Sequence, residues 1–294
     1  MATNQFLSFG QGTGANVLSQ TDWAALAART GGFQAGTASS AAANKAWRQA
    51  LLASAALGQF IADFSGADAL DTDTPAQMEA KFILAMRSQI LGSQAIYSAQ
   101  GSFTATVPSW ATSADVIVTG AGGGSGGSPG SQASGGGGAG GTAIKRVTGL
   151  VPGSSIAVTV GLPGTAGNTS GSGSTANGGT GGTSSFGSYC SATGGTGGLV
   201  YTAGPAGGAP GVGSGGDLNL YGGYGTDGQA SGSTFGGQGG ASYWGGGGRA
   251  ASGSAGGIGV AGLAPGSGAG GIYGSAAQAG AFGAPGIVHI TWRP

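Results

Sequence analysis

The chain has 294 residues, no net formal charge and charged side chains at only 6% of its positions. A chain so poor in charge excludes bulk electrostatic binding to nucleic acid or to an anionic membrane. The single cysteine, Cys190, excludes an intrachain disulfide framework and a cysteine-rich zinc site, and we expect its thiol to be buried. The sequence shows no apolar run long enough for a membrane span and no secretory signal pattern at its N-terminus.

Composition divides the chain into two parts. Residues 1–92 hold 11 of the 18 formal charges. Only ten glycines precede Gly120, so 62 of the 72 glycines lie from there on, about one residue in three. We therefore predict two domains, a helical one over 1–92 and a glycine-rich one over 93–294.

The first domain carries three helix signals. Ser19 can cap a helix over 20–30, and Gly31 can take the left-handed conformation that ends it. A second helix is predicted over 41–64. The run Thr74-Pro-Ala-Gln77 is a capping box with proline at the first helical position, and it predicts a third helix that continues through Ile90.

The second predicted helix has apolar or small residues at alternating spacings of four and three: Ala43, Trp47, Ala50, Ser54, Leu57, Ile61 and Phe64. This spacing is typical of a coiled coil. We expect self-association around a fibre axis, with Trp47, Leu57, Ile61 and Phe64 as the oligomerisation residues. The alternative is an ordinary helical hairpin packed within one chain.

From Gly101 the apolar period changes to two, which predicts strands. They are expected at 102–107, 114–119, 142–148, 154–160, 183–191 and 286–293. The strands lie at both ends of the glycine-rich stretch and interrupt its first half. The sequence therefore predicts an all-β sandwich from which the glycine-rich segments are excursions.

The glycine-rich segments lack the strict Gly-X-Y repeat of collagen. Each excursion is too poor in side chains to form a core of its own. An extended threefold helix without internal hydrogen bonds leaves the amide groups free to pair sideways with neighbouring segments. We expect inserted helices of this polyglycine-II type. Disordered glycine and serine loops on a small sandwich are the alternative.

The sequence matches some catalytic motifs, but only because it is rich in glycine and serine. Gly122-x-Gly124-x-x-Gly127 follows a predicted strand, but neither an amphipathic helix nor a nearby acidic residue comes after it. The Gly-x-Ser-x-Gly pattern occurs at Ser125 and Ser128, about as often as glycine content alone predicts. The sole histidine, His289, lies in a predicted strand. We expect no catalytic residues, no metal site and no cofactor.

Aromatic rings among glycine, serine and asparagine are typical of antibody binding loops, and rings beside Asp and Asn suit sugar faces and hydroxyls. The segment 217–227 and the pair at 243–244 show this mixture. The candidate receptor-binding residues are Asp217, Asn219, Tyr221, Tyr224, Asp227, Tyr243 and Trp244. The alternative is that the rings fill gaps between the sandwich and the glycine-rich layer.

The order of the β segments resembles the glycine-rich domain of bacteriophage tail-fibre proteins. The resemblance covers about residues 101–294 and lies in FTATVP at 103–108, DVIVTGAGGG at 115–124, VPGSSIAVTVG at 151–161, GTSSFG at 182–187 and GIVHITW at 286–292. The first domain resembles the base of phage and prophage tail fibres, in segments 4–9, 14–18, 47–49 and 59–63. The glycine motifs are also similar to those of the tip adhesins of T-even-type phages.

The resemblance implies a non-enzymatic adhesin of the virion, located in a tail fibre or tail tip and made in the host cytoplasm. It implies a homotrimer that is fixed to a tail or baseplate protein through its N-terminal region. Its distal loops would bind a bacterial surface glycan or outer-membrane protein, and nucleic acid is not an expected partner. The helical base departs from the tip-adhesin pattern and favours a complete short fibre. A purely structural tail component and a host-polysaccharide depolymerase are the alternatives.

Overall fold

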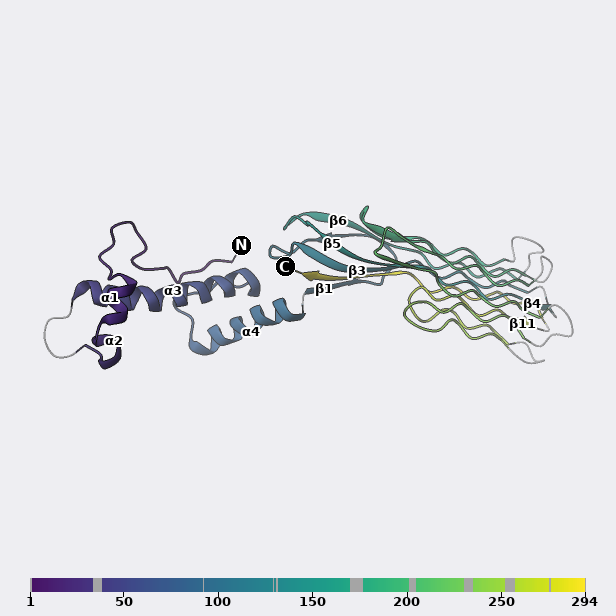
Figure 1. Ribbon diagram of the computed structural model, residues 1–294. Coiled ribbons are helices and arrows are strands. Elements are labelled where there is room, and N and C mark those ends of the chain that lie inside the picture. The colour runs from purple at the N-terminus through teal and green to yellow at the C-terminus, as the bar shows by residue number, and fades with distance from the viewer. Residues whose placement is uncertain are drawn as a thin grey trace. The chain divides into compact units, whose positions relative to one another are not determined.

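A computed structural model of the chain divides into two compact units, Met1–Gly92 and Ser93–Pro294 (Figure 1). The structure describes residues 2–33, 39–91, 93–128, 130, 132–169, 177–200, 205–229, 235–251, 257–274 and 276–293.

The first unit begins with two short helices, α1 (Gln20–Ala25) and α2 (Ala28–Gly31). The Ser19 hydroxyl accepts a hydrogen bond from the Asp22 N–H at 3.1 Å, which confirms the predicted cap. One helix over 20–30 is wrong, because Leu26 takes an extended conformation between the two. Neither helix buries a side chain, and so short a helix is marginal without packing. The glycine with a positive φ is Gly32, at φ 72° and ψ 171°, and not Gly31.

The two longer helices, α3 (Ser40–Ser65) and α4 (Pro75–Leu91), pack against each other. Their contact includes the ring of Phe60, which lies 5.8 Å from that of Phe82. The capping box is confirmed: the Thr74 N–H donates to Gln77 Oε1 at 2.8 Å, and the Gln77 N–H donates to Thr74 Oγ1 at 3.3 Å. Within the described residues, no helix has the length and apolarity that crossing a bilayer requires.

The second unit contains two antiparallel five-stranded sheets. The first has the order β1-β12-β3-β5-β10, formed by β1 (Ser93–Tyr97), β12 (Ile287–Arg293), β3 (Ser113–Thr119), β5 (Thr142–Thr148) and β10 (Leu218–Leu220). The second has the order β2-β6-β7-β8-β9, formed by β2 (Gly101–Thr106), β6 (Ser155–Val160), β7 (Ser184–Phe186), β8 (Cys190–Ala192) and β9 (Gly213–Ser214). A separate short pair joins β4 (Gln132–Ala133) and β11 (Tyr273–Gly274).

Five of the predicted strands match observed ones, and the sixth, 183–191, is wrong as a single strand. It forms β7 and β8, which pair as a hairpin through Gly187 at φ 51°, a conformation that favours glycine. Strand β1 was not predicted. It pairs with the last strand of the chain, and Ser93 faces Trp292 in the register.

One apolar core lies between the sheets and draws on both of them. Val116, Val118 and Ile290 of the first sheet pack with Val158 and Phe186 of the second. The Cys190 thiol belongs to this core, and burial raises its pKa to about 11. The prediction of a buried thiol is therefore confirmed.

Protonation of the Asp115 carboxylate at low pH should destabilise the two sheets. The guanidinium of Arg146 is bidentate on this carboxylate, at 2.7 and 2.9 Å, and holds its pKa below the ordinary value of 3.8. A lowered carboxyl pKa adds stability above the unfolded-state value, and this stability is lost as the pH falls through the folded-state value. We expect the urea concentration at the unfolding midpoint to decrease as the pH is lowered below about 4. In Asp115→Asn this decrease should be less steep. An equally steep fall in that variant would contradict this role.

Candidate functional site

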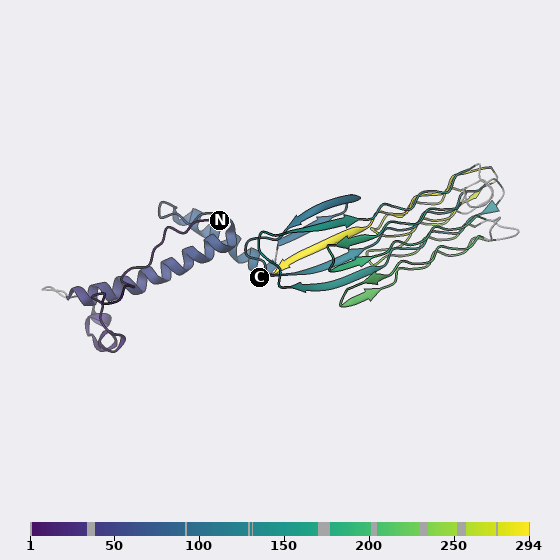
Figure 2. The ribbon, with the colours of Figure 1, turned by 90° about the horizontal axis from the view of Figure 1, so that it is seen from above.

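Glycine-rich segments run side by side away from the two sheets, and both views show this arrangement (Figures 1 and 2). We call this array the glycine bundle. Its segments are 120–128, 132–141, 161–169, 177–182, 193–200, 205–212, 221–229, 235–241, 245–251, 257–262, 267–274 and 276–286.

Backbone hydrogen bonds in the bundle follow a period of three. In 120–128, successive N–H groups donate in rotation to segments 132–141, 177–182 and 276–286. The acceptors are the carbonyl oxygens of Gly141, Gly182, Ala284, Gly138, Gly179 and Ala281, for donors 120 to 125 in that order, at 2.8 to 3.0 Å. Each residue therefore bonds a different neighbour from the residue before it, unlike a β-strand.

Three segments, 120–128, 132–141 and 267–274, form the interior of the bundle. The first also accepts bonds from three further segments, through donors Gly164, Gly195 and Ala269. It is thus hydrogen-bonded to six neighbours. Segment 132–141 also has six, because it donates to 193–200, 221–229 and 267–274 and accepts from 120–128, 205–212 and 235–241. In this interior the main chain itself is the packing unit.

Glycine is required inside the bundle by the close approach of these backbones. A Cβ on Gly123 would overlap the carbonyl oxygen of Thr196, and one on Gly137 would overlap that of Gly123. Most interior side chains are small, with the fully buried Ile272 as an exception, and some of them bond the backbone of the bundle. Ser134 Oγ, for example, accepts from the Ile272 N–H at 3.0 Å and donates to the Gly126 carbonyl at 2.7 Å.

On outer segments, every third residue is exposed. We call each such row a ridge. The exposed residues are Leu162, Thr165 and Asn168 on one ridge, Thr193 and Thr196 on another, Tyr221, Tyr224 and Asp227 on a third, and Phe235, Gln238 and Ala241 on a fourth. Most large side chains therefore lie on the outside of the bundle, and its interior is mainly backbone, with Val200 and Ile272 as buried exceptions.

Threonine hydroxyls complete the hydrogen bonding at the surface of the bundle. Thr196 Oγ1 accepts from the Ala209 N–H at 2.6 Å and donates to the Ala209 carbonyl at 3.4 Å. Thr193 bonds the backbone of Val212 in the same way, at 2.9 and 3.3 Å. Each hydroxyl thus accepts a backbone N–H, a role that the carbonyl of an adjacent segment has in the interior.

Replacing Thr196 by valine should lower the free energy of unfolding by about 1 kcal/mol, because the shape is kept and a backbone N–H loses its acceptor. Thr180→Val is the matched control. Thr180 is also exposed on an outer segment and makes no side-chain hydrogen bond within the described part of the chain. Equal urea midpoints for the two variants would contradict the proposed contribution of the Thr196 hydroxyl.

The structure brings three of the predicted receptor-binding residues together and separates the others. Tyr221, Tyr224 and Asp227 share one ridge, and the tyrosine side chains are 74% and 73% exposed. The carboxylate of Asp227 accepts the Gly207 N–H at 2.8 Å. Tyr243 is half exposed in a turn between bundle segments. Trp244 is partly buried, and its indole N–H donates to Thr119 Oγ1 at 2.9 Å, where a strand meets the bundle.

Asp217 and Asn219 lie at the edge of the first sheet and not on the ridge. Asp217 Oδ2 accepts the Arg146 N–H at 2.7 Å. Asn219, in β10, bonds both the N–H and the carbonyl of Gly216 at 3.0 Å. These side chains hold a sheet edge and a local turn in place.

The four predicted oligomerisation residues divide into two pairs. Ile61 is fully buried within the helical unit, and the ring of Phe64 lies 5.1 Å from that of Phe60. Trp47 is 60% and Leu57 44% exposed. Further large apolar side chains are exposed on α3 and α4: Leu51, Leu52, Phe82, Ile83, Leu84 and Met86. The described part of this unit therefore leaves a large apolar surface uncovered.

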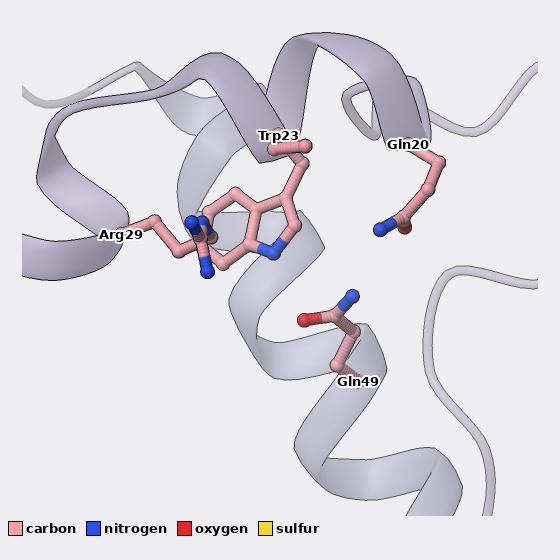
Figure 3. Close-up of a pocket in the computed structure, with 5 residues that line it drawn as sticks. Gln20, Trp23, Arg29 and Gln49 are labelled. Atoms are coloured by element: carbon pink, nitrogen blue, oxygen red, sulfur yellow. The ribbon is translucent and has the colours of Figure 1, made fainter.

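An open hollow of about 440 Å³ lies in the helical unit (Figure 3). It is lined by Gln20, Trp23, Ala24, Arg29 and Gln49. In the close-up the guanidinium of Arg29 overlaps the indole of Trp23, and the amides of Gln20 and Gln49 lie to the other side of the view.

The residues that match catalytic motifs have structural partners. Gly122 and Gly124 donate their N–H groups to carbonyls inside the bundle, and Ser125 Oγ accepts the Ala281 N–H at 2.8 Å. His289 Nε2 lies 3.5 Å from Gln94 Oε1 on the neighbouring strand. Among the described residues, no group of three or more side chains is placed to hold a metal ion.

The fold and the site define a class: a glycine-rich domain in which two antiparallel sheets carry a bundle of hydrogen-bonded glycine segments. Residues 98–293 match the family model described as a glycine-rich domain, and the chain belongs to this family. No curated protein matches the chain.

Proposed function

We propose that the chain is a bacteriophage tail-fibre adhesin that attaches a virion to a bacterial surface by non-enzymatic binding. The observation that carries the proposal is a bundle whose interior is mainly backbone and most of whose large side chains are exposed on outer ridges. A rigid platform presents exposed rings at little entropic cost on binding. The sequence resemblance of both units to tail-fibre proteins supports the same function.

We also propose that the bundle segments are polyglycine-II-type helices. A threefold extended helix turns successive N–H groups in three directions. The rotation of hydrogen-bond acceptors along 120–125 supports this conformation. It also accounts for the exposure of every third residue on the outer segments.

The helical unit is proposed to form the trimeric base and to join the fibre to a tail or baseplate protein. Extensive exposed apolar surface marks association sites, and two further copies of the chain would cover the large apolar side chains that α3 and α4 expose. Three copies also raise the attachment strength of a weak single site through effective concentration.

The direct test is binding of the purified, labelled full chain to a panel of bacteria that differ in surface glycans and outer-membrane proteins. The adhesin proposal predicts selective binding to some strains, with no reducing sugar released from their polysaccharides. Uniform absence of binding would support a structural tail component instead. Release of reducing ends would support a depolymerase.

A further inference from the structure

The ridge of segment 221–229 has a repeat that can match a repeating ligand. Tyr221 and Tyr224 are three residues apart and both are about three-quarters exposed. In an extended threefold helix that rises about 3.1 Å per residue, such residues lie on one edge about 9 Å apart. That distance is close to the length of a disaccharide in an extended chain.

The neighbouring ridges shape the surface beside these rings. The Gly225 N–H donates to the Gly208 carbonyl at 2.9 Å, so the small side chains of Ala206 and Ala209 lie along one flank. The Thr226 N–H donates to the Gln238 carbonyl at 2.8 Å, so the ridge that begins with Phe235 lies along the other. The tyrosine ridge is therefore flanked by small alanine side chains on one side and by the Gln238 amide on the other.

The charge of this surface selects among ligands. Segments 205–212, 221–229 and 235–241 contain one carboxylate, that of Asp227, and no lysine or arginine. The surface offers no counter-charge to a phosphate or to an acidic polymer. Hydroxyl and amide groups, by contrast, are suited to hydrogen bonds with neutral hydroxyls.

The exposure of the two rings favours a glycan over a protein partner. Protein loops are held mainly by buried anchors that fill pockets. The two rings instead project from an outer ridge, where each presents an apolar face and a polar tip. Rings of this kind can stack on the faces of successive pyranose units.

We propose that Tyr221 and Tyr224 form a docking ridge for an extended, uncharged polysaccharide of the bacterial surface, with Asp227 and Gln238 bonding its hydroxyls. This inference rests on the proposed adhesin function and names the ligand class of its binding surface. It places binding on the side of the bundle.

The test uses the full chain on an array of purified bacterial surface polysaccharides, neutral and acidic, together with intact cells of the same strains. We expect retention on neutral polysaccharides. Tyr221→Ala and Tyr224→Ala should each weaken it about tenfold, which corresponds to about 1.4 kcal/mol. The pair Tyr221→Phe and Tyr224→Phe should keep most of the affinity, because the stacking faces remain.

Phe282→Ala is the matched control, since Phe282 is a 55% exposed ring on segment 276–286, which bonds 120–128 and 257–262. It should bind like the wild type, and all variants should keep the wild-type melting temperature. Binding to cells without retention on any neutral polysaccharide would contradict the proposed role of the tyrosine ridge but not the adhesin proposal. Retention unaffected by the alanine variants would also overturn the ridge. Failure to bind both cells and polysaccharides would contradict the two proposals together.

Discussion

Replacing Gly137 by alanine is expected to unfold the glycine bundle. The residue lies in the interior segment 132–141, where its N–H donates to the Ala269 carbonyl and its own carbonyl accepts the Gly240 N–H, both at 2.8 Å. The added methyl would overlap the carbonyl oxygen of Gly123. Because the obstacle is backbone bonded on several sides, no side-chain rotation can relieve the overlap.

The expected loss of unfolding free energy exceeds about 4 kcal/mol, which is exceptional for a single substitution and fits severe overpacking. It is comparable with the whole stability of many domains, about 5–15 kcal/mol. Urea unfolding of the full chain, followed by tryptophan fluorescence, measures it, because Trp244 and Trp292 both lie in the second unit.

Gly246→Ala is the matched control for this experiment. Gly246 belongs to a bundle segment as well, but a Cβ there meets nothing within 4 Å and its φ is not in the left-handed region. Alanine should leave stability unchanged or raise it by about 0.4–1 kcal/mol, because the unfolded chain loses freedom. Similar midpoints for Gly137→Ala and Gly246→Ala would show that the bundle interior is not tightly packed.

Replacing Leu57 by aspartate is expected to separate the proposed trimer into single chains. Leu57 is 44% exposed in the single chain, so the substitution should leave the helical hairpin folded. In a trimer the same position would bury an unpaired carboxylate, which is costly in an apolar contact. We expect association to weaken at least about a hundredfold, equivalent to about 2.7 kcal/mol.

Sedimentation equilibrium of the full chain measures this change, with circular dichroism to show that the helices remain. Gln49→Asp is the control, because it places the same charge at an exposed polar position of the same helix. A wild-type mass equal to one chain would refute the trimer. A Leu57→Asp mass equal to three chains would place the contact elsewhere.

The sequence predicted the elements that have local signals. The capping box at Thr74 and Gln77 is self-contained within four residues, and its reciprocal hydrogen bonds formed as expected. Strand β3 has apolar residues at 114, 116 and 118, and β12 has them at 288, 290 and 292, so a period of two marks both strands. Elements of this kind depend little on distant parts of the chain.

Elements that depend on distant contacts were missed. Strand β1 directly follows the helical unit and is defined by its pairing with β12, the last strand of the chain. The division of 183–191 at Gly187 depends on a positive φ that composition does not distinguish from the many other glycines. The predicted helix over 20–30 failed for want of any buried side chain to hold it.

The candidate site shows a similar division. Composition identified Tyr221, Tyr224 and Asp227, but not their common ridge with Gln238 and Phe235 beside it. Applying a three-residue period to 221–229 and 235–241 would have found these rows, because all five residues recur at that spacing. Composition also chose Trp244, whose hydrogen bond to Thr119 joins residues far apart in the sequence.

The most direct test of the account is amide hydrogen exchange of the full chain, resolved to peptides from 120–128, 132–141 and 267–274. If backbone hydrogen bonds hold these segments in a rigid bundle, their N–H groups should exchange as slowly as those of β3 and β12. Exchange at the rate of an unstructured peptide would show that the glycine bundle does not persist in solution, and the platform for the tyrosine ridge would be lost with it.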